Sequence, residues 1–425
     1  MMRWLLILAC GVAAGAADPD PALVLQRASI KARVRAATLP NYTCVETVTR
    51  DYYRATVQPP AGTCGAGLEE PQQPEARPGV QAILTDRLRL DVTMTSHGEI
   101  YSWVGASKFE DSGIDAVVHQ GPISTGSFGA MLTIVFAQDA KTFQYRGTSR
   151  QDGHTIMEYS FQEVQSNSRY KVKSGDSWIN SGYSGSVQVD PETNEVVRLT
   201  VETDQLPPAA GTCQIGSDME FHMVRIGEGA FPLPKQGRQR FVDPNGDEVD
   251  NVTTFGSCRE YRGESTITFF PAPDNSAGGS PGSAAAPPVT IPAGLSFAFE
   301  LTTPISADIA AGGDPFSGRL VSALRVKGKT IAPAHAPVEG RLLRVEMRRT
   351  APPSATIVLK LRTVEVAGVK IPLAAIRDFR RLPPAGKRGS QLLLPNRWEG
   401  DSGVFQVRGE HAVMKAGTRT DWVTR

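Results

Sequence analysis

Apolar and polar residues alternate along much of the first two thirds of the chain, and this pattern predicts β-strands. Two pairs of alternating segments each flank a short turn-forming stretch, as in a hairpin: 88–95 with 99–105, and 185–190 with 195–203. Two more alternating segments follow at 218–226 and 264–270. We therefore expect a long meander of antiparallel strands in this part of the chain.

One helix is expected before the strands, from Pro21 to Ala37. Apolar residues recur there at spacings of seven, four and three, and the basic residues lie largely outside that stripe. The stripe consists of Leu23, Ile30, Val34 and Ala37. Leu39-Pro40 should end the helix, because a residue before proline is pushed out of the α region.

A second helix should interrupt the strands near residue 130. Ser124 or Thr125 is the expected N-cap. The apolar face that follows is Phe128, Met131, Leu132, Val135 and Phe136. Such a helix would cover or plug the curved sheet from one side.

The last third of the chain is also β-rich, but it is punctuated by glycine. A Pro/Gly/Ala/Ser-rich stretch without periodicity precedes it and predicts a flexible linker at 271–289. The sequence thus predicts one unit with a helix and antiparallel strands at 18–270 and a second, β-rich unit at 290–383. A polar tail follows at 384–425, and it either packs on this second unit through Trp398, Phe405 and Trp422 or is loose.

The first seventeen residues have the three-part build of a secretory signal. Met1-Met2-Arg3 is basic, Trp4 to Ala14 is mostly apolar, and Gly15 to Ala17 are small, so cleavage is expected after Ala17. The alternative is lipid attachment at Cys10. This apolar run is too short for a stable anchor, and no other long one follows, so we expect an exported, periplasmic or secreted chain without a transmembrane segment.

Four cysteines remain after the signal: Cys44, Cys64, Cys213 and Cys258. An even number in an exported chain favours two disulfides, with three possible connectivities. None belongs to a C-x-x-C pair or has a histidine at metal-ligand spacing, so we expect no metal site.

Charge divides at the linker. Residues 290–425 contain 21 Lys and Arg against 11 Asp and Glu, which leaves 24 basic and 33 acidic residues for the rest of the chain. The overall charge of +1 therefore hides two oppositely charged halves. The basic half is expected to dock at an anionic envelope surface rather than on nucleic acid, which an exported protein rarely meets.

Several segments of the front half resemble a group of exported acidobacterial proteins that have no assigned reaction. They are "LPNYTC", "STGSFGAMLTIVF", "YSGSVQVDPETNEVVRL" and "NVTTFGSCREYRGESTITF". The order of helix, meander and inserted helix also resembles the periplasmic lipoprotein carriers, which are half-open β-barrels that hold acyl chains. The resemblance to the acidobacterial group implies the disulfides Cys44–Cys258 and Cys64–Cys213.

The carrier resemblance implies that the front meander is curved into a half-barrel and holds a lipid or other apolar ligand in its cavity. The candidate lining residues are Trp103, Phe128, Met131, Leu132 and Phe136, and the alternative is that they form a closed core. In the rear half, "IPAG", "DPFSGRL" and "IAPAHAPVEGR" resemble the small barrel of conjugation and type IV secretion channel proteins. That resemblance covers 291–375 and implies assembly or docking.

The sequence contains no convergent catalytic group, and we expect neither enzymatic activity nor a cofactor. "GDSGV" (400–404) with His335 lacks the spacing of a serine-protease triad. "DPNGDEVDN" (243–251) is either a hairpin turn or a calcium loop without its terminal glutamate. Two functions remain: a carrier of an apolar ligand, and a structural or interaction protein of the cell envelope.

Overall fold

The computed structural model describes residues 19–38, 42–57, 64, 79–95, 98–106, 114, 117–118, 121–123, 125–126, 130–137, 142–226, 229–260, 290–378 and 400–425. The predicted signal, Cys10, the strand at 264–270 and the linker lie outside these residues. Within the described ranges the chain is mainly β, as predicted, and contains two α-helices, α1 (Pro21–Thr38) and α2 (Ala130–Ala137).

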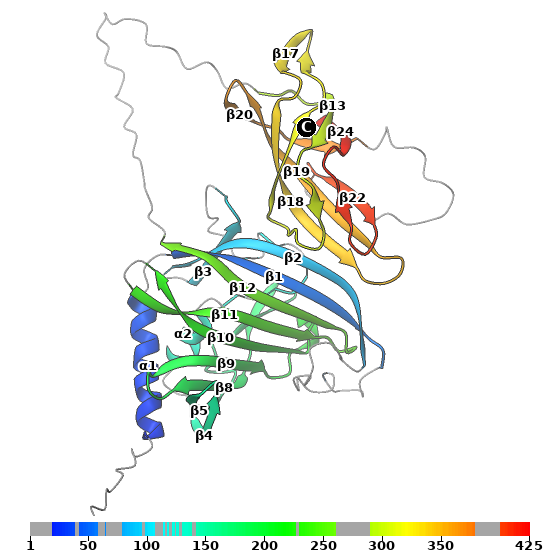
Figure 1. Cartoon of the computed structure of the whole chain (residues 1–425). Helices are drawn as coiled ribbons and strands as arrows, with labels where there is room; N and C mark the ends of the chain where they lie inside the picture. Colours follow the sequence, from blue (N-terminus) through cyan, green and yellow to red (C-terminus); the bar gives the residue numbers. More distant parts are fainter. Residues whose placement is uncertain are drawn as a thin grey trace, which may run out of the picture.

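The strands before the linker form one curved antiparallel sheet, called here the front sheet (Figure 1). Its order is β3-β2-β1-β12-β11-β10-β9-β8-β5-β4. The hairpin β6–β7 and the short 3₁₀-helix η2 (Pro208–Ala210) stand outside it. The strand bounds are β1 (Tyr42–Ala55), β2 (Val80–Thr95), β3 (Gly98–Trp103), β4 (Gln144–Gln151), β5 (His154–Glu163), β6 (Lys171–Ser174), β7 (Ser177–Asn180), β8 (Tyr183–Asp190), β9 (Glu195–Thr203), β10 (Gln214–Ile226), β11 (Gly229–Val242) and β12 (Glu248–Glu260). Both predicted hairpins are present, as β2–β3 and β8–β9.

Helix α1 begins where predicted, but it buries a different face. The Asp20 carboxylate accepts a hydrogen bond from the Ala22 N–H at 2.9 Å, which caps the helix, and Pro21 occupies the first turn. Val24 and Ala28 are the buried residues, whereas Leu23, Ile30 and Val34 of the predicted stripe are exposed. The prediction was wrong because periodicity finds an apolar stripe but does not say which stripe the sheet covers.

Helix α2 begins later than predicted, at Ala130 instead of near residue 124. Its first turn is capped from another element. The Glu99 carboxylate on β3 accepts hydrogen bonds from the Gly126 N–H at 2.6 Å and from the Ala130 N–H at 3.3 Å. A carboxylate at a helix N-terminus also complements the helix dipole. The cap therefore comes from a residue about thirty positions earlier, which local sequence does not reveal.

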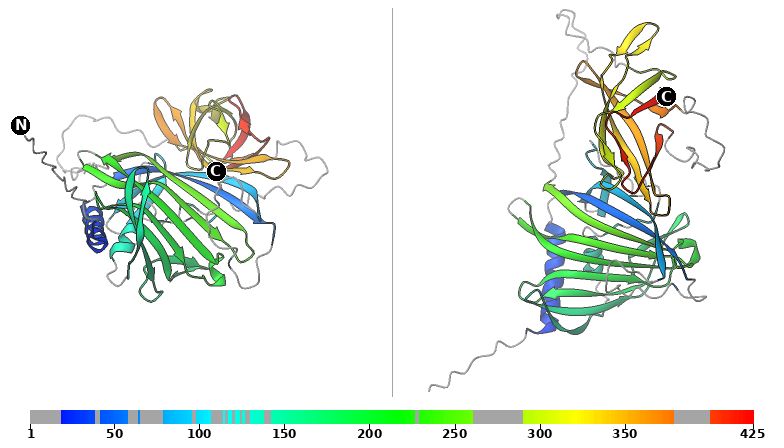
Figure 2. Two further views of the ribbon diagram at one scale, coloured as in Figure 1. Left: turned by 60° about the horizontal axis from the view of Figure 1, so that its bottom comes forward. Right: turned by 45° about the vertical axis from the view of Figure 1, so that its right-hand side comes forward.

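The strands after the linker form a second unit, called here the rear barrel. Its strands run in the order β24-β13-β15-β18-β19-β22. β21 pairs with β24, and its Arg377 N–H donates to the Ser402 carbonyl beside β22, which closes the barrel (Figure 2). The bounds are β13 (Ser296–Leu301), β14 (Ile305–Ser306), β15 (Pro315–Leu320), β16 (Leu324–Val326), β17 (Lys329–Ala332), β18 (Pro337–Arg348), β19 (Ser354–Val366), β20 (Val369–Pro372), β21 (Ala375–Arg377), β22 (Gly403–Arg408), β23 (Val413–Met414) and β24 (Arg419–Thr424).

The barrel extends beyond the boundary predicted at residue 383. Residues 400–425, assigned to a polar tail, supply β22, β23 and β24. Trp422 is fully buried in the barrel core, and its ring lies 6.2 Å from that of Phe405. Trp398 lies outside the described residues. The tail was misassigned because its strands are short and their polar residues face solvent.

The rear barrel continues the hydrogen bonding of the front sheet along the part of β2 that β3 does not cover. Residues 346–348 of β18 pair antiparallel with residues 84–86 of β2. Nearby, the Gly312 N–H donates to the Arg87 carbonyl at 2.8 Å, and the Arg89 N–H donates to the Gly312 carbonyl at 2.7 Å. Gly313 has a φ of +106°, and a Cβ there would lie 2.1 Å from the Arg89 carbonyl oxygen, so this approach requires glycine. The barrel thus covers an edge that would otherwise invite pairing with another chain.

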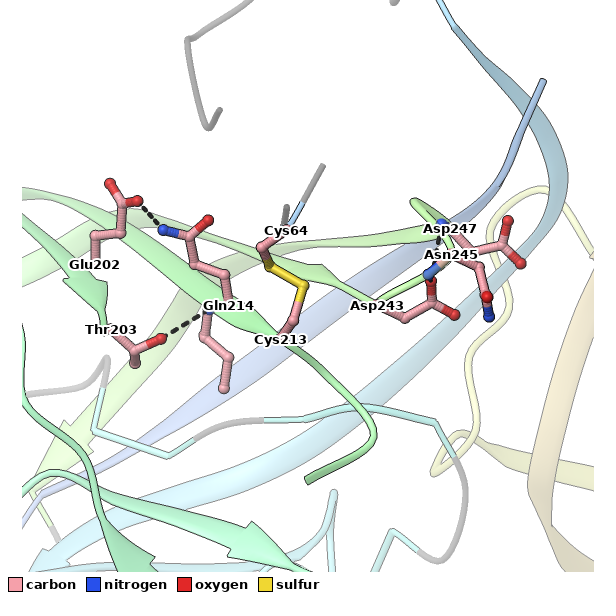
Figure 3. Close-up of a disulfide and its surroundings, with 9 residues drawn as sticks. Cys64, Glu202, Thr203, Cys213, Gln214, Asp243, Asn245 and Asp247 are labelled. Carbon is pink, nitrogen blue, oxygen red and sulfur yellow. Dashed lines mark hydrogen bonds between the residues drawn. A yellow bond between two sulfur atoms is a disulfide. The ribbon is translucent and has the colours of Figure 1, made fainter. Parts of the chain in front are cut away.

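Two disulfides join the cysteines in the pairing that the resemblance implied. Cys44–Cys258 connects the adjacent strands β1 and β12 across a sequence separation of 214 residues. Cys64–Cys213 joins Cys64 to the residue that directly precedes β10, across a sequence separation of 149 residues (Figure 3). Both bonds therefore close long loops of the front unit.

Candidate functional site

The structure gathers three of the five predicted lining residues. Met131 and Phe136 of α2 are buried in an apolar cluster with α1 and strands β5, β8, β9 and β10, and Leu132 packs half-buried at its edge. Trp103 packs against a different cluster, under β1 and β2. Phe128 lies outside the described residues. The candidate site is therefore the packed apolar contact between α2, α1 and the middle of the front sheet.

The sheet presents a continuous apolar surface to the two helices. Val187, Leu199 and Met219 stand directly opposite one another on β8, β9 and β10, and all three are almost completely buried. An aromatic chain links α2 to this surface: the Phe136 and Phe143 rings lie 5.9 Å apart, and the Phe143 and Phe161 rings 5.6 Å apart. Apolar contacts of this kind are not directional, so an apolar ligand of matching shape can replace them.

The helices do not cover all of their own apolar side chains. α2 contains only one polar residue, Thr133. Val135 is completely buried, while Leu132 and Ile134 are only half-buried. On α1, Leu23 and Ile30 are exposed. Both helices therefore expose apolar side chains to solvent in addition to those that they bury against the sheet.

Two acidic side chains, Glu46 and Glu99, lie close to each other near the start of α2. Neither was among the predicted site residues. Glu46 of β1 is almost completely buried and points to the same face of the sheet as Cys44 and Val48. Burial raises the pKa of Glu46 well above its ordinary value, and the charge of Glu99 raises it further. The Tyr101 hydroxyl donates to the Glu99 carboxylate at 2.6 Å. The available signal was the parity that places Glu46 on the same strand face as Cys44 and Val48.

Glu46 makes stability depend on pH. A folded-state pKa above the ordinary value of 4.5 means that the folded chain holds the proton more tightly than the unfolded chain. The stabilisation is complete below pH 4.5 and is lost as pH rises through the folded pKa, by at most about 1.4 kcal/mol per pH unit. We expect Glu46→Gln to flatten this decline and to exceed the wild type in stability at pH 8.

Denaturant unfolding of both proteins from pH 4 to pH 8 measures this effect. Glu339→Gln is the matched control, because Glu339 is half-exposed and pairs with Lys370 on the barrel surface. Parallel stability profiles for the wild type and Glu46→Gln would contradict the assignment.

A row of buried polar residues crosses the same face of the sheet. Asp86, Arg50, Asn251 and Gln239 stand directly opposite one another on β2, β1, β12 and β11. The Arg50 guanidinium donates to both Asp86 oxygens, at 2.7 and 2.6 Å, and both side chains are about 3% exposed. The Asn251 amide donates to the Pro122 carbonyl at 3.0 Å. These pairings hold the strands in one register, because a shift would leave buried charges unpaired.

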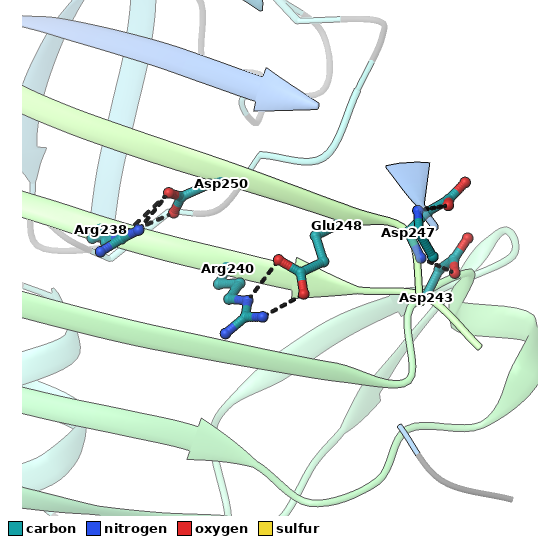
Figure 4. Close-up of polar contacts among 7 residues, drawn as sticks. Arg238, Arg240, Asp243, Asp247, Glu248 and Asp250 are labelled. Atoms are coloured by element: carbon teal, nitrogen blue, oxygen red, sulfur yellow. Dashed lines mark hydrogen bonds and ion pairs between the residues drawn. The ribbon is translucent and has the colours of Figure 1, made fainter. Parts of the chain in front are cut away.

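The opposite face of the sheet contains a cavity of about 370 Å³ across β8 to β11. Its walls are polar: Ser184, Ser186, Thr200, Glu202, Asp218 and Arg240. Each guanidinium at its rim faces a carboxylate. Arg238 pairs with Asp250 at 2.8 Å, and the Arg240 Nε donates to Glu248 at 3.0 Å (Figure 4). The charges of both guanidinium groups are therefore compensated within the sheet.

The segment from Asp243 to Asp247 forms the turn between β11 and β12. The Asp243 carboxylate accepts hydrogen bonds from the Asn245 N–H at 2.7 Å and from the Asp247 N–H at 3.0 Å. The hairpin alternative is therefore the one that the structure contains. Within the described ranges, no three His, Cys, Asp or Glu side chains converge as metal ligands.

No family model matches the chain, and no curated protein matches it. Solved structures similar to it include a LolA superfamily protein from Nitrosomonas europaea, with 8% identity and a TM-score of 0.27, covering 57% of this chain and 94% of that one. A putative outer membrane lipoprotein-sorting protein domain from Vibrio parahaemolyticus has 9% identity and a TM-score of 0.28, covering 57% and 93%. TM-scores this low do not support a conclusion about function. The resemblances to acidobacterial and conjugation proteins remain predictions.

Proposed function

We propose that the chain is an exported, non-enzymatic envelope protein that binds an apolar, lipid-like ligand between the front sheet and its two helices. One observation carries the proposal. The apolar surface formed by Val187, Leu199 and Met219 is roofed by helices that leave apolar side chains of their own at the outside.

Export is supported by the two disulfides. Such bonds form and persist in oxidising compartments and are rare where cytosolic reductants act. In the part of the chain that the structure describes, no helix has the length and apolarity needed to cross a bilayer.

Ligand entry requires an exchange of contacts. An acyl chain sliding under α2 would replace the contacts that Met131, Val135 and Phe136 make with the sheet. Each methylene removed from water contributes about 0.8 kcal/mol, so a chain of modest length offsets the packing that it displaces.

We expect Leu132→Asp to weaken binding of a fluorescent fatty-acid probe by about ten-fold or more, since a carboxylate at the edge of the apolar cluster must lose water when the probe binds. Thr133→Asp, on the exposed side of the same helix, is the matched control and should bind as the wild type does. Titration of the probe into each purified mature chain measures the effect. Equal affinities for the two variants would refute the assigned site.

Mass spectrometry of organic extracts from the native protein tests the same proposal without mutation. Recovery of a stoichiometric lipid supports the carrier. Its absence favours the second candidate, a structural or interaction protein of the envelope. That candidate is supported by the dense packing of Met131, Val135 and Phe136 and by the hydrogen-bonded union of the rear barrel with β2. The net charge of +10 on residues 290–425 supports an anionic envelope surface as the partner of the barrel.

A further inference from the structure

Helix α1 has a second apolar face, which the protein leaves in solvent. Leu23, Ile30 and Val34 are 40%, 48% and 54% exposed. Spacings of seven and four residues place them in one stripe along the helix. Val24 and Ala28, the residues that pack on the sheet, lie on another side. α1 is therefore apolar on two faces, and the sheet covers one of them.

Basic residues flank the exposed stripe. α1 contains Arg27, Lys31, Arg33 and Arg35 and no acidic residue. Arg27 and Arg33 are exposed. Lys31 lies toward the sheet, where its ammonium contacts Glu195 at 2.5 Å and the Thr193 carbonyl at 2.7 Å. The exposed face of the helix therefore carries apolar side chains bordered by cations. The helix itself lies along one side of the front unit and stands apart from the rear barrel (Figure 2).

We propose that this face of α1, defined by Leu23, Arg27, Ile30 and Val34, docks on an anionic phospholipid surface. An amphipathic helix of this build lies in the membrane interface, where its apolar residues enter the acyl boundary and its arginines meet the phosphates. A second copy of the chain is a poorer occupant, because two α1 helices packed face to face would bring their like charges together. The inference does not rest on the proposed ligand, because the protein without a bound apolar ligand would dock on the membrane equally well.

Vesicle co-sedimentation of the mature chain tests the inference. We expect binding to vesicles that contain phosphatidylglycerol, weak binding to pure phosphatidylcholine vesicles, and a decrease in binding at high salt. Ile30→Asp and Leu23→Asp should each weaken binding by about ten-fold, and Arg27→Gln by about three- to five-fold. Val164→Asp is the matched control, because Val164 is 54% exposed on the front unit and belongs to neither α1 nor the rear barrel.

Three results would overturn the proposal: no binding of the wild type to anionic vesicles, unchanged binding of Ile30→Asp, or an equal loss in Val164→Asp. Binding that survives the α1 substitutions would assign membrane contact to the basic rear barrel instead. Ile30→Ala serves as a second variant if the aspartate lowers helix content by circular dichroism. Failure here leaves the fatty-acid titration of Leu132→Asp unaffected, so the two proposals fail separately.

Discussion

Replacing Asp86 by alanine is expected to destabilise the mature chain by about 3–5 kcal/mol, because the substitution leaves the Arg50 guanidinium buried without its carboxylate partner. The pair lies in the centre of the β1–β2 ladder, where the two residues stand directly opposite each other. Two hydrogen bonds join them, and the Tyr52 hydroxyl also reaches Asp86, at 3.4 Å. Guanidinium chloride unfolding at neutral pH measures the loss.

The control for this prediction removes both charges at once. Arg50→Met combined with Asp86→Leu should recover most of the stability, since replacing a whole buried ion pair by apolar residues is often close to neutral. The prediction fails if Asp86→Ala costs less than about 1 kcal/mol, or if the double variant is no more stable than the single one.

Removing the Cys44–Cys258 disulfide is expected to cost about 4–5 kcal/mol in the chain-entropy model, because the bond closes a loop of more than two hundred residues. The double variant Cys44→Ala, Cys258→Ala also loses contacts in the apolar cluster that contains Tyr42, Val48 and Leu90. Denaturant unfolding of the oxidised wild type and of the variant measures the difference.

The second disulfide supplies a matched comparison. Cys64→Ala with Cys213→Ala opens a loop across 149 residues, so the same model predicts a similar entropic loss. Fully reduced wild type should be no more stable than either variant. A loss below about 1 kcal/mol in both variants would show that the bonds contribute little beyond the existing strand pairing.

The strands of the front sheet were predictable from sequence because their information is local. Val187 and Val189 alternate with Ser186 and Gln188, and a half-buried strand produces that alternation wherever it lies in a sheet. The turn at Asp243 to Asp247 was equally predictable, because its own side chains satisfy its backbone. The strands in residues 400–425 were not predictable from sequence, because β22 and β24 are recognised only through their pairing with β19 and β13.

The candidate site was only partly accessible to sequence reasoning. Met131 and Phe136 share a helix face, and the pattern correctly placed them in contact with the sheet. Trp103 was grouped with them on hydrophobicity alone, and β3 carries it to another cluster. Glu46 was overlooked because one carboxylate in a strand does not show which of its two faces is covered.

By itself, the sequence determined a mainly β chain with an early helix, and it located the cysteines that bond and the charge asymmetry between the halves. These properties depend on residue type and short-range periodicity. The tertiary structure decided which face of α1 is buried, where α2 is capped, and that the rear barrel extends the hydrogen bonding of β2. Each of these depends on contacts between residues distant in sequence, and therefore on the curvature and register of the whole sheet, which no local pattern contains.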